Sequence, residues 1–208
     1  TMMSCLFSSI KREINNDNGL LHFFSGEIHH IENRDEATVR KYIESIQDRL
    51  GVIDAQYFPL YFMKDSKEFT RHFIFQQVYN DIIIFGHFIR IHMHKNFITS
   101  ISSNIKNITL NTIPLITESG ALEIIRPNYI ETSSYLKYQK LQIYIKNNVP
   151  YLVHTIDAIS MESADRYMVD AHTGIIIDNL PLIYEDGPVM GSGINLLSET
   201  VDILNVYE

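Results

Sequence analysis

Residues 69–103 constrain the fold more than any other part of the chain. Within them, three apolar stretches rich in Ile and Phe are separated by two polar pairs, Asn80-Asp81 and Lys95-Asn96. Asn and Asp bond to their own backbone and tolerate positive φ, so such pairs form tight turns between strands. The pattern therefore predicts a three-stranded antiparallel meander over 69–103.

The middle stretch of this meander alternates with a period of two. One face carries Phe85, Ile89, Ile91 and Met93, and the other carries Phe88, Arg90, His92 and His94. This alternation predicts a sheet with one buried face and one face in contact with solvent.

A helix is predicted over 33–50, before the meander. Asn33 can cap it, Glu36 completes a capping box three residues later, and Gly51 supplies the stop. Its apolar positions recur at helical spacing and are Val39, Tyr42, Ile43, Ile46 and Leu50. A further short strand is expected over 57–63. A helix across an antiparallel sheet predicts an α+β fold with a small closed core.

The second half repeats this order after a polar, Asn-rich stretch that predicts a domain boundary within 104–115. A short helix is expected over 117–125, capped by Thr117 and ended by Arg126-Pro127. Four strands follow, at 141–145, 150–159, 166–170 and 175–178. The tight turn at 171–174 ends in Gly174, which supplies positive φ.

Three motifs give the chain a resemblance to known modules. Phe23-Phe24-Ser25-Gly26, together with the meander that runs from Phe75-Gln76-Gln77-Val78-Tyr79 to Phe85-Gly86, resembles the fungalysin/thermolysin propeptide module. Val169-Asp170-Ala171-His172-Thr173-Gly174 between two strands resembles the PepSY module. The resemblance implies two cystatin-like modules, each a helix packed on an antiparallel sheet. They would span 20–108 and 109–184, after an N-terminal extension at 1–19.

Residues 185–208 have a different character. Gly191-Ser192-Gly193-Ile194-Asn195-Leu196 resembles the opening of a mature thermolysin-type catalytic domain. The segment is therefore interpreted as the cleavage junction and the truncated start of a peptidase. We expect it to be disordered or paired opportunistically, because its own sheet is missing.

The resemblance implies an intramolecular chaperone and inhibitor that blocks the catalytic cleft of a secreted zinc metallopeptidase until it is cleaved. The expected partner is that peptidase's catalytic domain. By position, the segment predicted to lie in the cleft is Asn179, Leu180, Pro181, Leu182, Ile183, Tyr184, Glu185, Asp186 and Gly187. The alternative is a free-standing secreted protease inhibitor or binding module with no catalytic domain in the same chain.

The chain itself is not expected to be an enzyme. A zinc peptidase of this kind needs His-Glu-x-x-His, and the sequence has none. Ser192 lies between glycines but lacks the Gly-x-Ser-x-Gly spacing. No catalytic, metal or cofactor residues are therefore predicted here. The resemblance implies zinc, with calcium as a further candidate, for the catalytic domain that would follow.

Composition bears on partners and location. The net charge of −8 argues against a nucleic-acid partner, which requires clustered Lys and Arg. The single cysteine, Cys5, excludes a disulfide within the chain. No uninterrupted apolar run reaches the roughly 18 residues that a membrane helix needs, so no membrane partner is expected. We expect a secreted protein whose signal peptide is not in this sequence.

A metal site is the remaining alternative. His92 and His94 lie on one face of a predicted strand, and His72 on the neighbouring strand could face them. The other interpretation is an ordinary solvent-exposed sheet face, which Arg90 favours because its charge would repel a cation.

Overall fold

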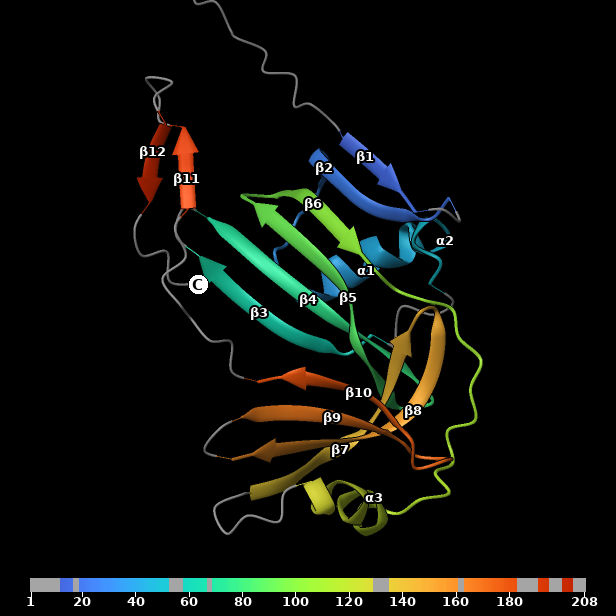
Figure 1. Ribbon diagram of the computed structural model, residues 1–208. Coiled ribbons are helices and arrows are strands. Elements are labelled where there is room, and N and C mark those ends of the chain that lie inside the picture. The colour runs from blue at the N-terminus through green and yellow to red at the C-terminus, as the bar shows by residue number, and fades with distance from the viewer. Residues whose placement is uncertain are drawn as a thin grey trace, which may run out of the picture. The chain divides into compact units, whose positions relative to one another are not determined.

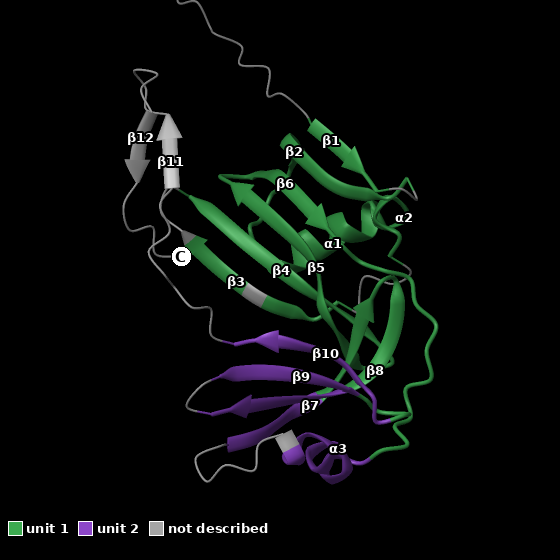
Figure 2. Ribbon diagram, viewed as in Figure 1, with its two compact units in different colours: residues 1–116, 141–153, 170–173 green, residues 117–140, 154–169, 174–208 purple. Residues whose placement is uncertain are grey.

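In this computed structural model the chain forms two compact units (Figures 1 and 2). Unit 1 comprises residues 1–116, 141–153 and 170–173, and unit 2 comprises residues 117–140, 154–169 and 174–208. The residues that the structure describes are 12–16, 19–52, 58–66, 69–128, 135–160, 163–182, 191–194 and 200–203. Strands β7 and β8 contribute residues to both units.

Unit 1 is built on an antiparallel sheet with the strand order β1-β2-β6-β5-β4-β3. The strands are β1 (Arg12–Asn15), β2 (Leu21–His30), β3 (Leu60–Ser66), β4 (Thr70–Tyr79), β5 (Ile82–His94) and β6 (Phe97–Ser103). The predicted meander is thus confirmed as β4, β5 and β6. Asn80, Asp81 and Lys95 have positive φ at its two turns, as the turn chemistry requires.

The predicted helix is present but begins later and is interrupted. It consists of α1 (Glu36–Ser45) and α2 (Gln47–Leu50), and Gly51 ends it in the left-handed conformation with φ 72°. The predicted cap at Asn33 is wrong. Asp35 is the N-cap, and its carboxylate accepts a 2.8 Å hydrogen bond from the Thr38 backbone N–H. Asp is as good a cap as Asn, and only Asp35 precedes the first helical turn directly.

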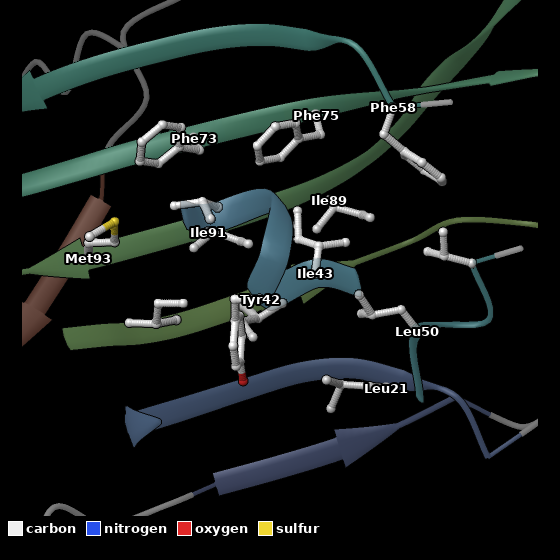
Figure 3. Close-up of a cluster of buried hydrophobic side chains, with 14 of the residues drawn as sticks. Leu21, Tyr42, Ile43, Leu50, Phe58, Phe73, Phe75, Ile89, Ile91 and Met93 are labelled. Atoms are coloured by element: carbon white, nitrogen blue, oxygen red, sulfur yellow. The ribbon is translucent and has the colours of Figure 1, made fainter. Parts of the chain in front are cut away.

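Helix α1 crosses one face of this sheet and closes the main core of unit 1 (Figures 1 and 3). It contributes Val39, Tyr42 and Ile43. The sheet contributes side chains with no exposed surface, which are Phe73, Phe75, Ile89, Ile91, Met93, Ile98 and Ile101. Full burial of one such side chain stabilises the fold by about 1.5–3 kcal/mol. The helix-on-sheet arrangement confirms the predicted α+β class.

A bulge in β5 decides which of its residues are buried. Val78 pairs with Ile83, yet Gln76 pairs with Phe88, so two residue steps on β4 match five on β5. Three extra residues therefore lie in β5, around Gly86, whose φ is 76°. The alternation predicted for the whole strand breaks at this point. Phe85 is only half-buried and Ile84 is fully buried instead, because an odd number of inserted residues exchanges the two faces.

Polar side chains bond to backbone groups of the bulge and of the residues that follow it. The buried Gln76 amide donates to the carbonyls of Ile84 (2.7 Å) and His87 (2.8 Å). Asn104 donates to the Gly86 carbonyl at 2.8 Å and accepts from the Phe88 N–H at 2.8 Å. The first glutamine of the sequence motif thus has a structural explanation, since a buried carbonyl without a donor is costly. The second, Gln77, donates to the Lys106 carbonyl at 2.6 Å and accepts from the Lys106 N–H at 3.0 Å.

A second, smaller core in unit 1 surrounds Ile84. Its buried members are Ile84, Ile143, Leu152 and Ala171. Ile84 and Ile143 are also paired residues, because β5 and β7 (Tyr135–Lys146) pair in parallel there. Asn147 and Asn148, with φ 52° and 63°, form the predicted turn into β8 (Val149–Ile159).

Unit 2 contains α3 (Glu118–Ile125), the short helix η2 (Arg126–Asn128) and the strand order β7-β8-β9-β10. The predicted cap is confirmed, since the Thr117 hydroxyl accepts from the Gly120 N–H at 3.2 Å. Ala121 and Ile125 are fully buried, so this short helix also presents one apolar face to the interior of its unit. Strands β9 (Ala164–Asp170) and β10 (Ile176–Pro181) complete the sheet.

The tail that was expected to be disordered or paired opportunistically contains a separate two-stranded antiparallel sheet. Strand β11 (Gly191–Ile194) pairs with β12 (Thr200–Ile203). Within the part of the chain that the structure describes, no helix is both long and apolar enough to cross a bilayer.

Candidate functional site

The segment predicted to lie in a protease cleft, residues 179–187, begins inside strand β10. Its first three residues pair with Tyr167, Arg166 and Asp165 of β9, in that order. The pairing is antiparallel, and β10 is the last strand in the order of this sheet. The final five residues, 183–187, lie outside the described residues.

The hydrogen bonding of β10 continues to the end of the described segment. The Leu182 N–H donates to the Ala164 carbonyl at 2.7 Å, and the Leu182 side chain is 38% exposed. Pro181 lies beside it and has no N–H, which suits an edge strand. Residues 179–182 are therefore held in the sheet.

A tight turn closed by hydrogen bonds precedes β10. The Asp170 carboxylate accepts from the N–H groups of His172 (2.7 Å) and Thr173 (3.1 Å). Gly174 follows with φ 77°, as predicted. This Asx turn explains why the Val-Asp-Ala-x-Thr-Gly motif needs both its aspartate and its glycine.

A charged network within unit 2 fastens the strands on which β10 is built. Arg166 donates from Nε to Oδ1 of Asp157 at 2.6 Å and from Nη2 to Oδ2 at 2.9 Å. The Gln139 amide donates to the same Oδ2 at 2.6 Å. These three residues belong to β9, β8 and β7. The hydrogen bond to Asp157 raises the pKa of Arg166 above its usual value, so the guanidinium stays charged.

A second, partly buried contact joins Tyr138 of β7 to His154 of β8. The Tyr138 hydroxyl lies 3.2 Å from His154 Nδ1, and the two rings are 5.7 Å apart between centroids. Burial raises the pKa of Tyr138 above its usual value, and the charge of Glu118 acts in the same direction. The contact therefore involves a neutral phenol at physiological pH.

The histidines singled out in unit 1 are brought together only in part. His72 and His92 are direct partners across β4 and β5, and their Nδ1 atoms are in contact. His94 instead has its Nδ1 3.5 Å from the Thr70 hydroxyl. Among the described residues, no three His, Cys, Asp or Glu side chains are grouped to hold a metal. Cys5 lies outside the described residues.

Sequence reasoning missed the Asp157 network. One signal was available, because Asp157 interrupts the apolar run of β8 and is nevertheless only 7% exposed. A charge inside such a run indicates a paired partner. The partner itself depends on the register of β9 against β8, which the sequence does not reveal.

Comparisons with known proteins give little. No family model matches the sequence, and no curated protein matches it either. Among solved structures, the chain is similar to the Bacillus megaterium YpeB C-terminal domain, with 12% identity and a TM-score of 0.40. That match covers 79% of this chain and 73% of the other. The α+β class is assigned from the chain's own strands and helices.

Proposed function

We propose that this chain is the pro-region of a secreted zinc metallopeptidase, acting as its intramolecular chaperone and inhibitor. The observation that carries the proposal is the order of the motifs along the chain. Phe-x-Ser-Gly comes first, the Gln-Gln-x-Tyr meander second, the Val-Asp-Ala-x-Thr-Gly turn third and the Gly-x-Gly-Ile-x-Leu segment last. Any one of these motifs alone is short, but their shared order is specific.

The geometry of β10 supports an inhibitory role for the segment that follows it. Residues 179–182 are fixed by β9, so the chain enters residues 183–187 from a defined point and direction. A peptide presented from a folded support loses less conformational entropy when a cleft binds it. Because the inhibitor and the enzyme share one chain, the effective concentration is high and moderate affinity is enough to block the site.

A chaperone role follows from the same arrangement. A peptidase domain with many non-local contacts folds slowly, because segments that are distant in the sequence must meet before these contacts can form. Unit 1 has two buried cores, and unit 2 buries Ile125, Ile156 and Met168, so each unit offers a preformed surface on which such a domain can assemble. The catalytic zinc, with calcium as a further candidate, would be held by residues of that domain.

The first test is to read the coding sequence beyond Glu208 for His-Glu-x-x-His. If it is present, the separately expressed chain is added to the mature peptidase and residual activity is measured. We expect concentration-dependent inhibition, and faster recovery of activity when the denatured peptidase is refolded with the chain. Absence of both effects would refute the proposal.

The cleft segment is tested with two variants and a matched control. One variant lacks residues 179–187, and the other keeps β10 intact but replaces residues 183–187 with Gly and Ser. The control lacks residues 1–9, a deletion of the same length. Both segment variants should inhibit more weakly than the parent, whereas the control should inhibit equally. Equal inhibition by all forms would place the contact elsewhere in the chain.

The second candidate function is a free-standing secreted inhibitor. It would be favoured if the reading frame contained no peptidase but the chain still inhibited one in trans. The Gly-led segment that forms β11 favours the pro-region, because a free-standing inhibitor has no need of the start of a catalytic domain.

A further inference from the structure

Two imidazoles in unit 1 face each other across neighbouring strands. His72 of β4 and His92 of β5 are direct cross-strand partners, with Nδ1 against Nδ1. Their ring centroids are 4.6 Å apart and the rings are inclined at 76°. Side chains directly opposite on an antiparallel pair have Cβ atoms about 4.5–5.5 Å apart, so the strands themselves hold the two nitrogens together.

The contact between the two Nδ1 atoms requires a proton between them, or a cation in the place of that proton. Two neutral imidazoles can meet at Nδ1 only if one carries N–H and the other offers its lone pair. A metal ion can take the place of that proton and accept both lone pairs. We infer that His72 and His92 form a two-histidine site for a late first-row divalent ion such as Zn²⁺, Cu²⁺ or Ni²⁺. This inference does not depend on the proposed function.

The positive charge of Arg90 is turned away from the pair. Its guanidinium carbon lies 4.8 Å from the centroid of the Phe88 ring, and Phe88 is on the side of Arg90 opposite His92 along β5. The cation–π contact holds the guanidinium over the Phe88 ring, although its charge still acts on His92. This orientation reduces the repulsion expected from the sequence but does not remove it.

The ligand type sets the choice of metal. Both ligand atoms are imidazole nitrogens, and the nearest hydroxyl on this row belongs to Ser100, the other strand partner of His92. Imidazole suits zinc, copper and nickel, whereas magnesium and calcium require oxygen ligands. The β3 residue paired with His72 is Lys64. Asp65, the next residue on β3, is bound by Arg71 at 2.6 Å, so β3 does not supply a carboxylate here.

The number of protein ligands is two. His94 is on the same face but is engaged with Thr70, and no group of three ligands exists among the described residues. Water would complete the coordination sphere. A small rotation of each ring would admit an ion at about 2.0–2.1 Å from both nitrogens, as zinc–imidazole bonds require.

The test uses the full chain with Cys5→Ser, so that the thiol does not bind the probe. Zinc chloride is titrated at pH 7.5 in a buffer that does not chelate, with calorimetric detection. Copper chloride is added separately for electron paramagnetic resonance. His72→Gln and His92→Gln are compared with His94→Gln and with His30→Gln, which changes an exposed histidine on β2. Circular dichroism confirms that each variant is folded.

We expect one zinc ion per chain at the pair and hyperfine structure from two nitrogens in the copper spectrum. Loss of either ligand should weaken binding by at least the roughly 10–100-fold that loss of an outer-shell partner costs. His94→Gln and His30→Gln should bind within about threefold of the parent, because neither removes one of the two ligands. No binding at millimolar zinc, equal binding by His92→Gln, or an equal loss in His94→Gln would overturn the two-histidine assignment. If a variant unfolds, the copper spectrum of the parent still tests the two-histidine assignment. A spectrum with fewer than two nitrogen ligands on copper would exclude the site.

Discussion

Arg166 donates to both carboxylate oxygens of Asp157, at 2.6 and 2.9 Å, from the strand next to the one that carries the acid. The Asp157 side chain is 10% exposed and that of Arg166 is 29% exposed. A carboxylate with so little contact with water depends on its partner, because the interior cannot solvate the charge. The pair therefore fixes β9 against β8 and, through β9, the position of β10.

Arg166→Ala should destabilise unit 2 strongly. It leaves the carboxylate of Asp157 without its bidentate donor, and an unpaired buried polar group costs about 1–3 kcal/mol. Urea denaturation followed by circular dichroism measures the loss. Arg126→Ala is the matched control, because Arg126 also forms an ion pair, with Glu123, but both side chains are more than half exposed. The control should lose less than about 1 kcal/mol, and equal losses would contradict the argument.

Gln76→Glu should be among the most damaging single changes in unit 1. It replaces the amide that donates to the Ile84 and His87 carbonyls with a carboxylate that can only accept. Two carbonyls would face a negative charge in a buried site, and the expected loss is at least the 1–3 kcal/mol of one unpaired group. Gln47→Glu, in the first turn of α2, should leave the urea midpoint nearly unchanged. A Gln76→Glu protein as stable as the parent would show that the amide does not hold the bulge.

The bulge also shows where sequence reasoning succeeds and where it stops. The Asn80-Asp81 turn correctly predicts the hairpin, and an unbroken hairpin from it would place His72 opposite Ile89. The structure places His72 opposite His92, because three residues are inserted in β5 around Gly86. A glycine in a strand signals a bulge, but the number of inserted residues depends on the partners that Gln76 and Asn104 provide. The register of β5 against β4 could therefore not be predicted from the sequence.

Sequence predictions of caps and turns were correct where a single residue determines the local backbone conformation. Thr117 at the start of α3 and Gly174 in the last turn were both predicted, because each acts within four residues of itself. The cap of α1 was misplaced by two residues, since Asn33 and Asp35 satisfy the same chemistry. The Arg166–Asp157 pair could not be predicted, because its two residues meet only when two strands align.

Stability should fall as the pH drops below about 6.5, the ordinary histidine pKa. Burial lowers the pKa of His87 in the folded state, although its ring also bonds to the Asn104 carbonyl, and Lys106 lowers it further. Below pH 6.5 the unfolded chain binds more protons than the folded chain, so protonation favours unfolding. Urea midpoints between pH 8 and pH 5 measure the slope.

His87→Gln should flatten this slope, because it removes one group with a lowered pKa. His92 contributes in the same window, since its pKa is lowered by burial, His72 and Arg90. Asp35 does not contribute to the change in stability between pH 8 and pH 5. Its hydrogen bonds to Thr38 lower its pKa, so its stabilising effect is lost only below about pH 4. An unchanged slope in His87→Gln would show that His87 is protonated equally in both states.

Gly174→Ala tests whether the turn before β10 also determines inhibition. With φ at 77°, Gly174 is in the left-handed region, where an L-residue costs about 1–2 kcal/mol. Gly120→Ala is the opposite control, because Gly120 is in helix α3, where Ala is favoured by about 0.5–1 kcal/mol. Gly174→Ala should lower the urea midpoint and weaken inhibition of the peptidase in trans, since strain in the turn loosens the register of β10 against β9. Gly120→Ala should raise the midpoint and leave inhibition unchanged. A destabilised Gly174→Ala protein with full potency would separate the two roles, because the inhibitory segment would then act without the support of the sheet.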